Sequence, residues 1–194
     1  MSAKSFHKIL IVPILFILAC SILTPQATPT EADFEKEEQV VYSFFISAGE
    51  GPALILENTA TGVSTGDVHQ SLDYIKSGLP NLSKETLDNF LQRNAQPGPL
   101  SSEMDLNAEY VLLTTEELSE ISGQPNWGEL LAEKYPGSYG YTIFSRVGFN
   151  NSLDQAVIYV GSVGGPLMGS GFYYLMEKKN GEWVITEKIM MWIS

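Results

Sequence analysis

The sequence predicts an α+β domain, in which N-terminal helices pack on a C-terminal four-stranded antiparallel meander. Three observations lead to this fold class. Apolar residues recur at helical spacing in several segments before residue 139. Four segments of strand character follow that point, and short connections join them. Because the helices come first in the chain, we expect them to cover one face of the sheet.

The helical segments are defined by their apolar spacing and by capping residues. In the first, Phe34, Val41 and Phe45 fall on one broad face, and Asp33 is the expected N-cap. In the second, Ser83 is the expected N-cap. The expected helices cover residues 33–47, 79–94 and 127–135, with shorter helical turns at 72–76 and 115–118.

The strand segments alternate apolar and polar residues or form short apolar runs. Asn180 and Gly181 give the clearest hairpin signal of the chain, because this pair favours a type I′ turn. The glycine-rich segment 161–171 is expected to be a wide loop between two strands. Strands are expected at residues 53–57, 109–114, 139–149, 155–163, 172–178 and 182–192.

The only cysteine, Cys20, ends the run ILAC at 17–20 behind a basic start and a short apolar stretch. This arrangement resembles the lipobox of bacterial lipoproteins, in which the chain is cut before the cysteine and its sulfur is lipidated. The resemblance implies a signal peptide at 1–19, a lipid anchor and disordered tether at 20–32, and one globular domain at 33–194. Plain secretion and an uncleaved anchor are the alternatives.

The charge restricts the partners and the location. The chain has 23 acidic and 11 basic residues, and loss of residues 1–19 would remove two of the basic residues, Lys4 and Lys8. Such a surface repels nucleic acid and anionic headgroups, so membrane attachment is expected through acyl chains on Cys20 alone. By the lipoprotein sorting rule, Ser21 implies the periplasmic face of the outer membrane in a Gram-negative host. The alternative is a secreted protein.

Three motifs resemble a group of uncharacterised bacterial exported proteins. They are SRVGFN at 145–150, the glycine-rich segment at 164–171 and the KxGxW hairpin at 179–183. The resemblance covers mainly residues 139–194 and implies where the domain ends, but it implies no activity. Some members carry a cysteine pair in the glycine-rich segment. This chain has none there, so thiol chemistry does not carry over.

The candidate binding residues lie in these same motifs. Arg146 and Asn150 could bind a carboxylate or phosphate, and Gly165, Leu167 and Met168 could form a recognition loop. Each has a structural alternative. Arg146 could pair with Glu177 or Glu187, and the glycine-rich segment could be a simple bulged connection whose apolar tip caps the core.

No metal site, cofactor or catalytic residue is predicted. His69 is the one histidine after the signal segment, and it is expected in an exposed loop. The sequence therefore favours a cell-envelope lipoprotein whose non-enzymatic domain binds an envelope protein or a small molecule. A small hydrolase-like envelope enzyme with a cleft between helices and sheet is the alternative, and a purely structural role is the third possibility.

Overall fold

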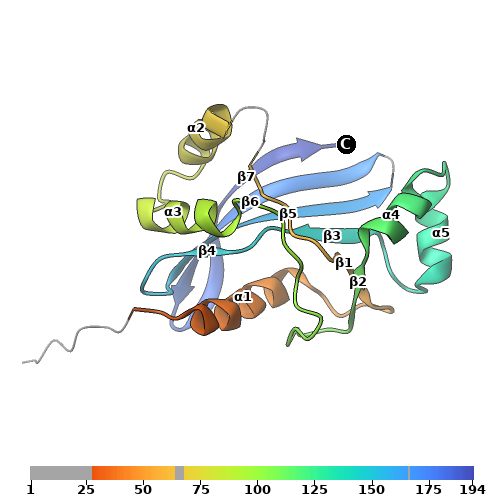
Figure 1. Cartoon of the computed structure of the whole chain (residues 1–194), viewed down its shortest axis with the longest axis horizontal. Helices are drawn as coiled ribbons and strands as arrows, with labels where there is room; N and C mark the ends of the chain where they lie inside the picture. The colour runs from red at the N-terminus through yellow and green to blue at the C-terminus, as the bar shows by residue number, and fades with distance from the viewer. Residues whose placement is uncertain (1–27, 64–67, 166) are drawn as a thin grey trace, which may run out of the picture.

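The structure is a computed structural model that describes residues 28–63, 68–165 and 167–194. Within these residues the chain forms five helices and one seven-stranded mixed sheet (Figure 1). The α+β class is confirmed, and an antiparallel β5–β6–β7 meander ends the chain. Cys20, the signal segment and most of the expected tether lie outside the described residues.

The elements fall close to the segments that the sequence predicts. The helices are α1 (Glu31–Phe45), α2 (Val68–Gly78), α3 (Lys84–Arg93), α4 (Thr115–Ser122) and α5 (Trp127–Lys134). The strands are β1 (Ala53–Leu56), β2 (Tyr110–Leu113), β3 (Tyr141–Phe144), β4 (Gly148–Phe149), β5 (Gln155–Gly165), β6 (Met168–Lys179) and β7 (Glu182–Ile193). None of these helices has the length and apolar character needed to cross a bilayer.

Two helix starts differ from the prediction. Thr30, and not Asp33, is the N-cap of α1; Asp33 is the third helical residue, and its carboxylate accepts the Thr30 N–H at 2.8 Å in a capping box. Ser83 caps α3 as predicted. Helix α3 begins only at Lys84, and not at residue 79, because the residues before it form a turn after α2. Helix α2 is longer than the helical turn expected at 72–76, and it includes His69.

The predicted antiparallel meander is present as β3-β5-β6-β7, but it is part of a larger mixed sheet. The strand order is β2-β1-β3-β5-β6-β7, with β4 beside β5, and β1 runs parallel to both β2 and β3. Helices α2 and α3 lie between β1 and β2 in the chain, and α4 and α5 lie between β2 and β3. Crossovers of this length allow parallel pairing, which a short hairpin cannot make.

Helices cover both faces of the sheet, and not one face as expected. Ala156 and Ile158 of β5 pack with α1, whereas Val157 between them packs with α2 and α3. Alternate residues of a strand point to opposite faces, so these contacts place α1 opposite α2 and α3. Figure 1 shows α1 below the sheet and the other two helices above it.

Helix α1 also contacts the last hairpin of the chain. The Trp183 indole N–H donates to Glu37 at 3.0 Å, and Lys178 Nζ lies 2.7 Å from the same carboxylate. At the hairpin tip, Asn180 and Gly181 have φ values of 56° and 87°. Both are positive, which confirms the predicted type I′ turn.

The glycine-rich segment is mostly strand, which corrects the prediction of a wide loop. Gly161 pairs with Gly171 across β5 and β6, and the two strands continue to Gly165 and Met168. The missing side chains make room for an indole ring. A Cβ on Gly171 would lie 2.2 Å from Trp192 Nε1, which donates to the Tyr159 hydroxyl at 2.7 Å.

Candidate functional site

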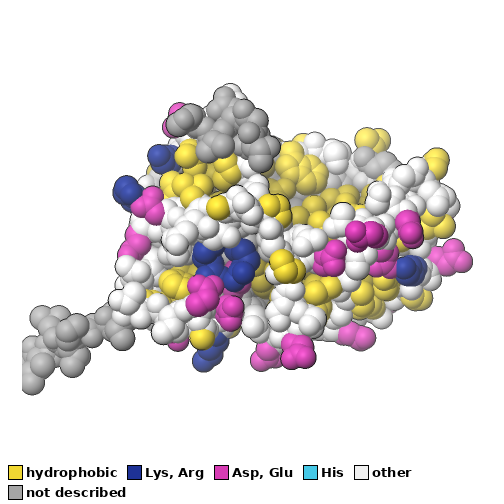
Figure 2. Space-filling model, in the orientation of Figure 1, with side chains coloured by type: hydrophobic (Ala, Val, Ile, Leu, Met, Phe, Trp, Pro, Cys, Tyr) yellow, Lys and Arg dark blue, Asp and Glu magenta, His cyan; other side chains and the backbone are white. Residues whose placement is uncertain are grey.

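A cavity of about 350 Å³ lies between α1, the segment 99–104 and Arg146. Helix α1 contributes Glu35, Glu38, Gln39 and Tyr42, which are spaced i, i+3, i+4 and i+7 and therefore share one helix face. Figure 2 shows basic side chains bordered by acidic ones on the surface between α1 and α3. The predicted binding residue Arg146 thus lies in a cavity.

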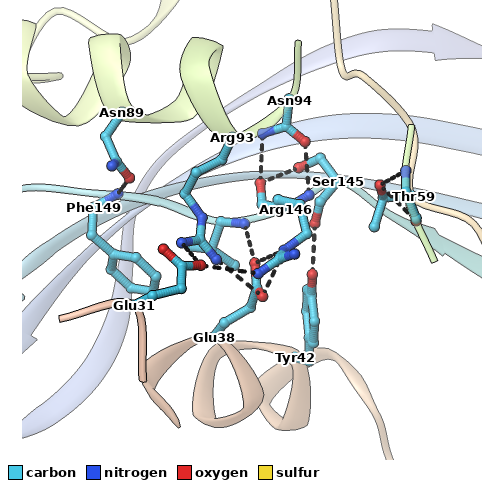
Figure 3. Close-up of polar contacts among 12 residues, drawn as sticks. Glu31, Glu38, Tyr42, Thr59, Asn89, Arg93, Asn94, Ser145, Arg146 and Phe149 are labelled. Atoms are coloured by element: carbon cyan, nitrogen blue, oxygen red, sulfur yellow. Dashed lines mark hydrogen bonds and ion pairs between the residues drawn. The ribbon is translucent and has the colours of Figure 1, made fainter. Parts of the chain in front are cut away.

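Glu38 is the centre of the polar network beside this cavity (Figure 3). Its side chain is 6% exposed, and its two oxygens accept from Arg146 Nε at 2.8 and 3.0 Å. The same carboxylate accepts the Val147 N–H at 2.7 Å and Arg93 Nη2 at 3.3 Å. Both arginines of the chain therefore converge on one buried acid, which satisfies the pairing that a buried charge requires.

Arg93 belongs to this network as a buried partner. Its side chain is 8% exposed, its Nη1 lies 2.8 Å from Glu31, and its guanidinium stands 5.4 Å above the Phe34 ring. It bridges α3 to the start of α1. Arg146 differs, because its side chain is 27% exposed and borders the cavity.

The backbone at 145–147 leaves the strand ladder, which is why the single strand expected at 139–149 is divided into β3 and β4. The Ser145 hydroxyl, and not its carbonyl, accepts the Tyr159 N–H at 2.9 Å. The freed carbonyl accepts the Tyr42 hydroxyl at 3.0 Å. Asn94 donates to the Arg146 carbonyl at 2.9 Å and accepts its N–H at 2.8 Å. Side chains thus replace the missing ladder bonds.

The rest of the SRVGFN motif is also structural. A Cβ on Gly148 would lie 2.5 Å from Phe90 Cα, so only glycine lets α3 approach this closely. The Phe149 N–H donates to Asn89 at 2.9 Å. Asn150 accepts the N–H groups of Asp154 and Gln155, both at 3.1 Å, and so closes the turn after β4.

The charges and the burial of the network shift the pKa values of Arg146 and Tyr42. Burial opposes ionisation of Arg146, but the Glu38 carboxylate outweighs it and raises the pKa of this guanidinium above its ordinary value. Burial raises the pKa of Tyr42 well above its ordinary value, and the negative charge of Glu38 adds to this. At neutral pH Tyr42 is therefore a hydroxyl donor, as its bond to the Ser145 carbonyl requires.

The partner of Arg146 is Glu38, and neither Glu177 nor Glu187, which the sequence suggested. Glu187 accepts instead from Asn81. The sequence contained a signal for Glu38 that was missed: it lies four residues after Phe34 and three before Val41, in the middle of the apolar stripe of α1. An acid in an apolar stripe indicates a buried ion pair.

The predicted site residues do not form one site. Gly165, Leu167 and Met168 lie at the β5–β6 hairpin tip, where the two apolar side chains are 83% and 69% exposed. Arg146 precedes Gly148, which pairs with Val157 of β5. The tip is eight strand residues farther along, a distance of about 26 Å. Because these two side chains are exposed, they do not cap the core, which was the structural alternative for this segment.

Among the described residues, no group of three or more His, Cys, Asp and Glu side chains is placed to hold a metal ion. In comparisons with known proteins, no family model, no curated protein and no solved structure matches this chain. The resemblance of its motifs to exported bacterial proteins therefore stays a prediction.

Proposed function

We propose that this protein is a cell-envelope lipoprotein whose domain binds a small molecule at Arg146 without transforming it. The observation that supports the binding role is that one side of this guanidinium is bound within the protein and the other side is accessible. Its Nε is held by Glu38, while the partly exposed side chain borders a cavity of about 350 Å³. An arginine that is fixed on one side and accessible on the other is pre-organised for a ligand.

The anchoring role rests on Cys20 and on where the domain begins. About ten residues separate this cysteine from Glu31, the first residue of α1. An extended chain of that length spans at most about 35 Å. A lipidated Cys20 would therefore hold the domain close to the membrane surface, and Ser21 directs it to the outer membrane in a Gram-negative host.

The alternative of a small hydrolase would place its cleft between helices and sheet, whereas this cavity is lined by α1, the segment 99–104 and Arg146. The state of its buried acid, Glu38, favours binding over catalysis. Glu38 already accepts from two arginines and one backbone N–H, so it is engaged as a structural acceptor and is not presented to a substrate proton.

Metabolic labelling with a clickable palmitate tests the anchor. We expect the wild-type protein to take up the label and to sediment with membranes, and Cys20→Ser to lose both properties. A wild-type protein that takes up no label but is cleaved and released would favour plain secretion. Retention in the membrane without label would favour an uncleaved anchor.

A further inference from the structure

We infer that the Arg146 cavity binds a zwitterion, namely an α-amino acid or a dipeptide that has a free amine, a free carboxylate and an apolar side chain. This inference rests on the proposed small-molecule function and names its ligand class. It follows from the charges around the cavity, the free groups that face it and its apolar wall.

Arg146 supplies the carboxylate end of the site. Its Nε is taken by Glu38, and Nη2 lies 3.7 Å from Glu31, beyond hydrogen-bond distance. Nη1 has no hydrogen bond to any part of the chain that the structure describes. The outer edge of the guanidinium therefore keeps N–H donors for a bidentate carboxylate.

The balance of charge disfavours a simple anion as the ligand. Arg93 and Arg146 are the cations of the site, and Glu31, Glu38 and Glu35 are its anions. The acids outnumber the arginines by one, so a phosphate or a dicarboxylate would meet a negative surrounding. A ligand that carries a positive group as well removes this penalty.

Glu35 supplies the other end. It is exposed at the cavity lining, one helical turn before Gln39 on the same face of α1. Glu35 makes no hydrogen bond or ion pair with any residue that the structure describes. A carboxylate in this position is available for an ammonium group. Gln39 uses its carbonyl oxygen for the Asp105 N–H at 2.8 Å, which leaves its amide N–H₂ as a further donor.

The opposite wall is apolar and fits a side chain. Leu100 and Met104 line the cavity and are each 8% exposed, with Pro99 beside them. Cavities that bind small ligands have volumes of roughly 300–1,000 Å³. At about 350 Å³ this one is at the small end of that range, which suits an amino acid or a dipeptide.

Calorimetric titration of the full-length protein with alanyl-leucine tests the inference. N-acetyl-alanyl-leucine removes the amine, and alanyl-leucinamide removes the carboxylate. We expect the free dipeptide to bind and each blocked form to bind at least about tenfold more weakly, because one charged hydrogen bond is lost each time. Equal affinity for the free and either blocked form would overturn the zwitterion.

Variants test which residue binds the amine of the ligand and which binds its carboxylate. Glu35→Gln is expected to weaken the free dipeptide about tenfold and to leave the N-acetyl form unchanged, with Glu182→Gln on β7 as an exposed-acid control. Arg146→Lys should weaken both of these ligands, since it removes the planar fork. If Arg146→Lys misfolds, Glu35→Gln still decides, because Glu35 is outside the buried network. An unchanged Glu35→Gln overturns the proposed amine contact.

Failure of this inference can be told from failure of the proposed function. If alanyl-leucine does not bind but N-acetyl-alanyl-leucine binds in an Arg146-dependent manner, the zwitterion is wrong and small-molecule binding stands. If neither the free nor a blocked form binds, the zwitterion is wrong, and titration with succinate and inorganic phosphate then decides the wider proposal. Palmitate labelling tests the anchor independently of both.

Discussion

Two glycine-containing regions of the same sheet have opposite surroundings. The segment 145–150 is enclosed by α1 and α3, and its backbone is held by side chains of both helices. At the end of the β5–β6 hairpin, Leu167 and Met168 are exposed. Both regions have the same sequence signal, glycine within a strand pattern, yet only in the first do side chains of two helices bind the backbone.

Glycine serves a different purpose in each region. At Gly148 it admits the backbone of a helix, which cannot move aside. At Gly169 and Gly171 it admits side chains instead, mainly the ring of Trp192 from the neighbouring strand, with Ser194 Oγ and the Tyr159 hydroxyl also close. At Gly165, next to the tip, an added Cβ would have no neighbour closer than 3.7 Å. The identity of the neighbour therefore decides how much a substitution costs.

The largest expected effect is on the enclosed region. Glu38→Gln should lower the free energy of unfolding by about 3–5 kcal/mol, because it leaves two largely buried arginines without their shared counter-charge. Urea unfolding followed by circular dichroism measures this. Glu35→Gln, on the same helix but exposed, should stay within about 0.5 kcal/mol of wild type. Similar values for both would show that the buried network does not stabilise the fold.

A matched glycine pair tests the two regions directly. Gly148→Ala should cost about 2–3 kcal/mol, because the new methyl group overlaps the Phe90 backbone and α3 must shift. Gly165→Ala places its methyl group at ordinary contact distance from Met168 and should cost less than about 1 kcal/mol. Thermal unfolding of the two variants ranks them. A reversed order would contradict the assignment of α3 as the element that Gly148 admits.

The turn at the other end of the meander gives an intermediate value. Gly181→Val forces a β-branched residue to the positive φ of a type I′ turn and should cost about 1–3 kcal/mol, although an added Cβ would have no neighbour within 4 Å. Asn180→Gly is the control, since glycine also accepts a positive φ there. Wild-type stability of the valine variant would show that backbone strain at a tip is relieved by local movement.

The smallest effect is expected at the exposed hairpin end. Leu167→Ser combined with Met168→Ser should change the free energy of unfolding by no more than about 0.5 kcal/mol, because both side chains are mostly in solvent. Chemical denaturation provides the measurement. A loss above about 2 kcal/mol, the range of core truncations, would mean that the tip packs on the domain in solution.

Local sequence patterns predicted the positions of the elements well. Apolar periodicity located α1, α3, α5 and the meander, and the Asn180–Gly181 pair identified its turn. The parallel pairing of β1 and β2 was missed, because a four-residue strand such as Ala53–Leu56 has no feature that selects its neighbour. The direction of pairing depends on the crossover and on the whole sheet.

The candidate site was predicted only at Arg146. Its partners Asn94 and Glu38 are 52 and 108 residues away in sequence, and periodicity carries no information over such distances. Asn150 and Gly165 were selected with Arg146 because they share its motifs, yet the fold sends them to other places. A signal for the missing partner was present in α1, where one acid interrupts an apolar stripe.

The contact of Glu37 with Trp183 has a consequence for the order of events in folding. The two residues are 146 positions apart, and Tyr42 finds its Ser145 partner 103 positions later. Helix α1 is synthesised first, but its polar partners are made late, and contacts at such separation form slowly. The domain therefore closes only when its last hairpin has emerged. For the exported lipoprotein proposed above, this delay would suit passage through a translocation channel, because threading requires an unfolded polypeptide.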